Sequence, residues 1–201
     1  MSALSKKKVI AITGSMGSGK SKVSSLIREK YPVIDCDEIN RELIKKGNEG
    51  YNQLILLKYI QLDKLGYIDK THMANQVFKN PVYKKEVESI LHPLIFQKVD
   101  EWVCTQNVPV VFVEVPILFE CNRQNQFDEV WCVVCCQQIA LDRLQKGRNI
   151  SKEQALMRLH NQLDPSIKAR QSDVVIENDG SLEELKCKVY GELRKGEKRW
   201  N

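Results

Sequence analysis

The segment "GSMGSGKS", residues 14–21, carries the most recognisable chemistry of the chain. It fits the pattern G-x-x-x-x-G-K-[ST], with its fixed positions at Gly14, Gly19, Lys20 and Ser21. Such glycines let the backbone curl so that successive N–H groups point inward, while the lysine reaches the β- and γ-phosphates and the serine hydroxyl holds Mg²⁺ directly. An apolar run precedes the segment and an amphipathic pattern follows it, which favours a nucleoside triphosphate site over a glycine-rich turn without a ligand. The expected ATP-binding residues of the loop are Gly14, Ser15, Met16, Gly17, Ser18, Gly19, Lys20, Ser21 and Lys22.

Acidic side chains stand at the ends of two other apolar runs. In "VIDCDEI" (33–39), Asp35 and Asp37 are two positions apart and therefore share one side of an extended chain. A carboxylate at this place can accept a hydrogen bond from an attacking hydroxyl, or hold a water on Mg²⁺; the alternative is a pair of helix N-capping aspartates. Glu114 ends "VVFVE" and is a second candidate to act on Mg²⁺ through a water, with a plain structural acid as the alternative.

Arginines recur in the polar segment 137–162. Arg143, Arg148 and Arg158 lie on helical patterns joined by a polar turn at 147–149. Arginines on such a flap can close over transferring phosphates and neutralise the charge of the transition state. The alternative is a solvated helix face, and the phosphate-loop motif makes us favour a lid at about 137–165.

Elements able to position these residues follow from the hydrophobic pattern. Five short runs, most of them continuous in Val and Ile, indicate strands buried on both faces, as in a parallel sheet: 8–13, 32–37, 108–115, 128–135 and 173–178. Helical patterns separate the runs. Two of them open with capping boxes, Ser151 with Gln154 and Ser181 with Glu184, and we expect Pro165 to end the first. The fold class is therefore α/β, a P-loop NTPase-type doubly wound sheet of about five parallel strands.

Residues 40–103 interrupt this alternation. The stretch is long, mostly helical in pattern, and contains no convincing strand. We expect a helical insertion at 40–103 within a core formed by residues 1–39 and 104–201.

Composition limits the classes of function. The 201 residues are 42% hydrophobic and 28% charged, with a formal net charge of +5, which suits an anionic substrate but is too weak and scattered for nucleic acid. We expect no membrane segment and no signal peptide. The seven cysteines have no framework spacing, and Cys132 and Cys135 are read as buried thiols of a strand. These features predict a cytoplasmic protein without nucleic-acid or membrane partners. We expect a monomer or weak oligomer, although no feature of the sequence decides the oligomeric state.

Beyond the phosphate loop, motifs along nearly the whole chain resemble those of the dephospho-CoA kinase family. The quoted segments are "VIDCDEI" (33–39), "GYID" (66–69), "VF" (77–78), "ILHPLI" (90–95), "EVPILFE" (114–120) and "SDVVIENDGS" (172–181), with spaced Gln137, Arg143, Arg148, Arg158 and Gln162 between the last two. The phosphate loop alone is generic, whereas "ILHPLI" together with "VPILFE" is specific.

The resemblance implies an enzyme that uses ATP and Mg²⁺ to phosphorylate the 3′-hydroxyl of dephospho-CoA, giving CoA and ADP in the last step of coenzyme A synthesis. By position it implies that Asp37 receives the hydroxyl proton and that Asp35 neighbours it in the acceptor site or the Mg²⁺ water shell. Lys20, Arg143 and Arg148 would stabilise charge on the γ-phosphoryl group. The resemblance also implies that the 40–103 insertion binds the CoA substrate, with His92 and Pro93 near the acceptor. Asn178 and Gly180 would lie near the adenine.

Departures from the family pattern and alternative readings accompany this expectation. Lys22 stands in place of a threonine, Ser15 in place of a glycine, and Glu114 in place of an aspartate, which makes its Mg²⁺ role less secure. For His92 the alternative is an imidazole that braces a helix break before proline. The alternative functions are a P-loop kinase for another nucleoside-like or small-metabolite acceptor, and a regulatory nucleotide-binding protein. A guanine-reading N-K-x-D is absent, which argues against a GTPase switch.

Overall fold

The protein consists of two compact units. The structure, a computed structural model, describes residues 7–148 and 151–200. Met1–Ile34 and Gln106–Asn201 form the first, here called the sheet unit, and Asp35–Thr105 forms the second, here called the helical unit. The polar turn predicted at 147–149 lies partly outside the described residues.

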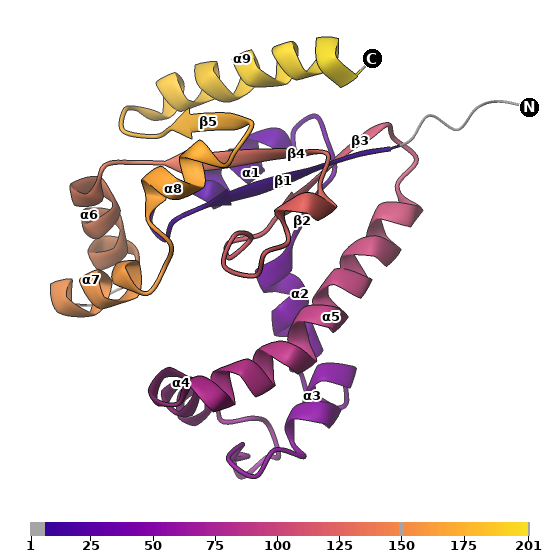
Figure 1. Cartoon of the computed structure of the whole chain (residues 1–201), viewed down its shortest axis with the longest axis vertical. Helices are drawn as coiled ribbons and strands as arrows, with labels where there is room; N and C mark the ends of the chain where they lie inside the picture. Colours follow the sequence, from indigo (N-terminus) through magenta and orange to yellow (C-terminus); the bar gives the residue numbers. More distant parts are fainter. Residues whose placement is uncertain (1–6, 149–150, 201) are drawn as a thin grey trace, which may run out of the picture. The chain divides into compact units, whose positions relative to one another are not determined.

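A five-stranded parallel sheet is the centre of the sheet unit (Figure 1). Its order is β2-β3-β1-β4-β5, so β1 occupies the middle. The strands are β1 (Lys8–Gly14), β2 (Val33–Asp35), β3 (Val110–Glu114), β4 (Glu129–Val134) and β5 (Val174–Glu177). Each forms within one of the five apolar runs or at its edge, and the predicted α/β fold with about five parallel strands is confirmed.

Helices complete the sheet unit. Apolar residues of α1 (Lys20–Ile27) and α9 (Leu182–Trp200) join β-strand residues such as Ile12, Phe112 and Trp131 in one buried core. The short helix α8 (Pro165–Arg170) contacts β4 and β1. A second cluster unites α6 (Gln137–Arg148) with α7 (Lys152–His160), and a 3₁₀ turn spans Gln124–Gln126. α-Helices connect β1 to β2, β2 to β3 and β4 to β5, whereas turns and the 3₁₀ segment connect β3 to β4.

The two predicted capping boxes are present. Ser151 accepts a hydrogen bond from the Gln154 N–H, and the Gln154 side chain accepts one from the Ser151 N–H. At the start of α9, Ser181 and Glu184 make the same reciprocal pair, at 2.8 and 3.2 Å. These bonds satisfy N–H groups that the first helical turn leaves without partners.

The predicted end of the helix that follows Ser151 is wrong. α7 ends at His160, with Asn161 as its C-cap, well before Pro165. Pro165 instead begins α8, where Asp164 is the N-cap and accepts a hydrogen bond from the Ser166 N–H at 2.7 Å. Proline at the first helical position is favourable because its missing N–H has no partner there in any case.

The helical unit contains four helices among its described residues: α2 (Cys36–Leu43), α3 (Glu49–Leu54), α4 (Lys70–Lys79) and α5 (Pro81–Thr105). α5 is the longest and contacts the other three through a buried stripe that includes Leu91, Leu94 and Val99. Pro93 lies inside α5, and the helix continues through it rather than ending there. An isolated antiparallel bridge joins Leu62 and Ile68.

A buried ion pair fixes α8 against the rest of the sheet unit. Nζ of Lys168 lies 2.7 Å from Oε1 of Glu120, and the lysine side chain is fully buried while Glu120 keeps 24% of its side-chain exposure. The same carboxylate oxygen accepts a hydrogen bond from the Leu163 N–H at 3.1 Å. Among the described residues the ammonium has no aligned hydrogen-bond acceptor, so its attraction to Glu120 is mainly coulombic.

Candidate active site

The phosphate-loop motif forms the connection between the central strand β1 and helix α1. Gly14 ends β1 with φ +144°, and a Cβ there would lie 2.2 Å from the Val133 carbonyl oxygen, so only glycine fits beside β4. Ser15 has a negative φ, since Asn122 is the sole described non-glycine residue with positive φ. A serine therefore fits at this position where the family usually has glycine. The first N–H groups of α1 point out of the helix into the loop, which is the arrangement that binds anions.

Lys20 reaches back over its own loop. Its Nζ donates hydrogen bonds to the carbonyl oxygens of Gly14 at 2.9 Å and Ser15 at 3.0 Å. The ammonium group therefore lies at the start of the loop, within reach of an anion that the loop amides would hold. Lys22, the departure from the family pattern, is exposed in the first turn of α1.

Ser21 and Glu114 meet beside the loop. The Ser21 hydroxyl donates to Oε1 of Glu114 at 3.3 Å, and Glu114 is 3% exposed at the end of β3. β3 lies beside β1, with Glu114 in register with Ile12. The end of β3 therefore lies next to the loop that follows β1 and leads to Ser21. A hydroxyl and a carboxylate are hard oxygen donors that suit Mg²⁺, an ion that keeps several waters and needs few protein ligands. Accordingly, the described part of the chain has no group of three or more His, Cys, Asp or Glu residues able to cage a metal.

Arg143 and Asn178 contact the loop from outside. Nη1 of Arg143 donates to the carbonyl oxygens of Gly17 and Ser18, and Nδ2 of Asn178 donates to Ser18 O at 2.8 Å. Gly180 packs against the carboxylate of Glu184 in the capping box of α9. Arg148 is the last residue of α6, but its side chain lies outside the described residues.

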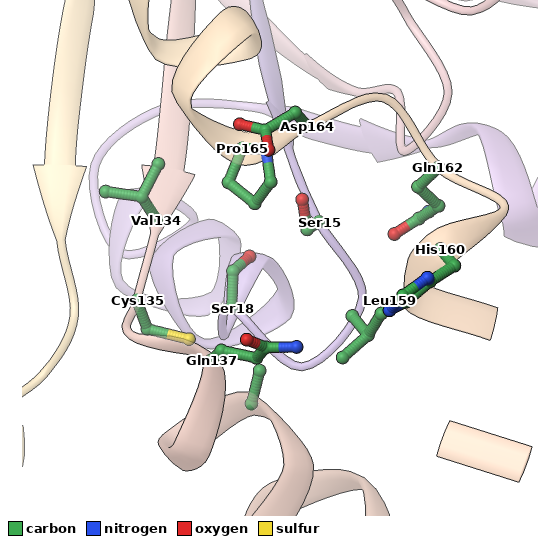
Figure 2. Close-up of a pocket in the computed structure, with 11 residues that line it drawn as sticks. Ser15, Ser18, Val134, Cys135, Gln137, Leu159, His160, Gln162, Asp164 and Pro165 are labelled. Carbon is green, nitrogen blue, oxygen red and sulfur yellow. The ribbon is translucent and has the colours of Figure 1, made fainter. Parts of the chain in front are cut away.

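A cavity of about 380 Å³ opens on the side of the loop that faces α6, α7 and α8. Ser15 and Ser18 point into it from the loop, while His160 at the end of α7 and Gln162 and Asp164 of the α7–α8 connection line it (Figure 2). Among the described residues the two serine hydroxyls have no hydrogen-bond partner although both are buried. The remaining lining residues are Val134, Cys135, Gln137, Ala140, Leu159 and Pro165.

The α7–α8 connection also touches the loop backbone. Oε1 of Gln162 accepts a hydrogen bond from the Met16 N–H at 2.7 Å, and the Met16 side chain packs on the apolar cluster of α6 and α7. Cys135 donates from its thiol to Gly17 O at 3.7 Å, and burial raises the pKa of that thiol. Sequence reasoning placed Cys135 inside a strand and overlooked Asp164 and His160; for His160, an isolated His in a helical pattern carries no local signal.

The predicted acceptor-site residues belong to the helical unit. Asp35 ends β2 and is the N-cap of α2, accepting a hydrogen bond from the Asp37 N–H at 2.7 Å. The N-capping alternative thus describes Asp35, whereas Asp37 lies in the first turn of α2. His92 and Pro93 lie near the middle of α5, so the alternative of a helix break at this proline is not realised.

The fold and the loop define a P-loop nucleotide-binding protein. Its parallel sheet has the order 2-3-1-4-5, a glycine-rich loop follows the central strand, and a lysine and a serine–carboxylate pair lie at that loop. A profile of the dephospho-CoA kinase family (CoaE) matches residues 8–184. A dephospho-CoA kinase of Oceanobacillus iheyensis is 35% identical over 201 residues, which cover 96% of this chain and 98% of the relative. The chain belongs to the dephospho-CoA kinase family.

Solved structures share the fold of this chain. TT1252 from Thermus thermophilus superposes with a TM-score of 0.82 at 29% identity, covering 94% of this chain and 98% of that one. A dephospho-CoA kinase from Campylobacter jejuni shares the fold with a TM-score of 0.68 at 24% identity, covering 94% and 96% of the two chains. The predicted activity is therefore confirmed: the protein is an enzyme that transfers phosphate from ATP to dephospho-CoA in the final step of coenzyme A biosynthesis. Within the described ranges, no helix has the length and apolar character needed to cross a membrane.

Proposed function

We propose that the loop from Gly14 to Ser21 binds the triphosphate of ATP and that Lys20 stabilises the charge that develops on the transferred phosphoryl group. The observation that carries this proposal is the convergence, at one loop, of the Lys20 ammonium and the Ser21–Glu114 pair. Phosphoryl transfer needs mainly positioning and electrostatic stabilisation, which a rigid loop on a buried strand supplies. Arg148 is proposed to add positive charge during transfer, and Gly180 to border the adenine.

The metal of the reaction is proposed to be Mg²⁺. Ser21 would hold it directly through its hydroxyl and Glu114 through a water, in keeping with the 3.3 Å between their oxygens. When bound together with ATP, Mg²⁺ neutralises charge on the β- and γ-phosphates. Glu114 has one methylene more than the aspartate usual in the family, and its carboxylate accepts a hydrogen bond from the Ser21 hydroxyl.

The acceptor is proposed to bind to residues 40–103, which lie within the helical unit, near His92 and Pro93. Asp37 is proposed to accept the proton of the 3′-hydroxyl of dephospho-CoA. The carboxylate of Asp35 accepts a hydrogen bond from the Asp37 backbone N–H, and so would orient the first turn of α2 and with it the Asp37 side chain. Asp35 is thereby proposed as a positioning residue that also borders the acceptor or the Mg²⁺ water shell.

We further propose that the enzyme acts in the cytoplasm as a monomer or weak oligomer, without nucleic acid as a partner. The seven cysteines without framework spacing fit a reducing compartment, and the modest net charge of +5 fits small anionic substrates.

The decisive experiment measures ADP release with and without dephospho-CoA, in the wild type and in Asp37→Asn. We expect dephospho-CoA to stimulate ADP release, and Asp37→Asn to lower kcat by at least about a hundredfold while ATP still binds. The matched control is Glu38→Gln, which neutralises the exposed carboxylate next to Asp37 in the same helix and should leave kcat near normal. Near-normal turnover of Asp37→Asn would remove that residue from its role, and stimulation only by a different alcohol would replace the acceptor.

A further inference from the structure

Two side chains hold the outer edge of the phosphate loop. The Ser18 carbonyl oxygen accepts hydrogen bonds from Nδ2 of Asn178 at 2.8 Å and from Nη1 of Arg143 at 3.3 Å. The Gly17 carbonyl oxygen accepts a further bond from Nη1 of Arg143 at 3.4 Å. Two consecutive carbonyl groups of the loop are therefore fixed by donors from the β5–α9 connection and from α6.

The two side chains also fix each other. Nη2 of Arg143 donates to the backbone oxygen of Asn178 at 3.0 Å and to its Oδ1 at 3.4 Å. This second pair of bonds orients the Asn178 amide, because Oδ1 faces the guanidinium and Nδ2 must then face Ser18. Asn178 is 6% exposed, so its bond to Ser18 is shielded from water, while Arg143 is half-buried.

Gly19 shows how closely the amide approaches. A Cβ on Gly19 would lie 2.1 Å from Nδ2 of Asn178, and Gly19 has φ +93°. Glycine at this fixed position of the phosphate-loop motif is therefore required twice here, by the backbone conformation and by the contact with Asn178.

The planar peptide bond converts these contacts into an orientation of the loop amides. The C=O of one residue and the N–H of the next point in opposite directions. Fixing the Gly17 and Ser18 carbonyl groups outward therefore directs the N–H groups of Ser18 and Gly19 inward. The Ser18 N–H donates a hydrogen bond to Ser15 O within the loop, at 3.2 Å, so of these two amides it is the Gly19 N–H that would meet an anion.

We propose that Asn178 and Arg143 are positioning residues that hold the phosphate loop in its anion-binding shape before ATP arrives. The proposal rests on the proposed function of the loop as the triphosphate site. It replaces the expectation that Arg143 acts on the γ-phosphoryl group and that Asn178 borders the adenine, because the donors of both side chains are directed at the backbone of the loop and of the β5–α9 connection. Their effect on ATP passes through the loop amides, and it concerns the phosphates rather than the base.

The test compares three probes in the wild-type enzyme, Asn178→Ala and Arg143→Lys. ATP, inorganic tripolyphosphate and adenosine each compete with a fluorescent ATP analogue in the absence of acceptor. Arg143→Lys keeps the positive charge and loses the planar fork, so its effect reports geometry. Gln171→Ala, which removes an exposed amide at the C-cap of α8, is the matched control.

We expect each of the two variants to weaken ATP and tripolyphosphate by the same factor, about tenfold, and to leave adenosine unchanged. The KM for ATP should rise accordingly, while the KM for dephospho-CoA stays within about twofold, a split that general destabilisation would not produce. Weaker ATP binding with unchanged tripolyphosphate binding would overturn the proposal and return Asn178 to the adenine. Unchanged binding of both phosphates would also overturn it. Failure of the wild type to bind ATP or tripolyphosphate would instead refute the triphosphate site itself.

Discussion

Neutralising Glu120 should destabilise the sheet unit strongly, because Lys168 has no access to water. The ammonium is fully buried at 2.7 Å from the carboxylate, and Glu120→Gln keeps an oxygen for the Leu163 N–H while it removes the charge. Removing one member of a buried ion pair costs about 3–5 kcal/mol, and we take the lower end, about 3 kcal/mol, because Glu120 is 24% exposed. With a urea dependence of about 2 kcal/mol per molar, the midpoint should fall by about 1.5 M.

Tryptophan fluorescence during urea unfolding measures this change, since Trp131 is fully buried in the same unit. The matched control is Glu183→Gln. Its partner Lys186 lies at a similar distance, 2.8 Å, but the Lys186 side chain is 37% exposed and the Glu183 side chain 77% exposed. That variant should leave the midpoint unchanged within error, because solvent screens exposed pairs. Replacing both members, with Glu120→Leu and Lys168→Met, should restore most of the lost stability. If Glu120→Gln unfolds at the same urea concentration as Glu183→Gln, burial does not set the strength of this pair.

Two further predictions concern the metal and the pH dependence. Glu114→Gln should raise the Mg²⁺ concentration needed for half-maximal activity by about tenfold, since it removes the charge beside Ser21; an unchanged Mg²⁺ titration would exclude Glu114 from the metal site. Burial, reinforced by the hydrogen bond to Glu197, raises the pKa of Tyr31 from 10.0 to about 12. The folded protein then keeps this proton when the unfolded chain has lost it, so the stability that Tyr31 contributes is complete below pH 10 and falls as the pH rises toward 12. Unfolding midpoints measured across this range should decline less steeply for Tyr31→Phe, and an identical decline would contradict the assignment.

Features encoded by local sequence were predicted well. Continuous runs of Val and Ile located β1 and β3. Strands that are buried on both faces carry apolar residues at successive positions instead of alternating with polar ones. The capping boxes at Ser151 and Ser181 were found because their two partners lie only three residues apart. The phosphate loop was found for the same reason.

Features that depend on distant partners were missed. α7 ends with Asn161 as its C-cap, and Gln162, just beyond it, accepts a hydrogen bond from the distant Met16 N–H. No periodicity in that segment indicates either feature. The pair Asp164–Pro165 does carry a local signal, an N-cap followed by proline at the first helical position, and it was read only as a stop. Arg143 illustrates the wider limit: a helical pattern locates the residue, but its acceptors come from segments far away in the chain.

The position of the helical unit within the chain has a consequence for biosynthesis. β1 leaves the ribosome first, yet its two neighbours, β3 and β4, are translated only after all of Asp35–Thr105. The helical unit is one uninterrupted segment and has every partner for its internal contacts as soon as α5 emerges. The nascent phosphate loop must wait for distant strands, and the order of translation therefore makes the first-made strand one of the last to become structured.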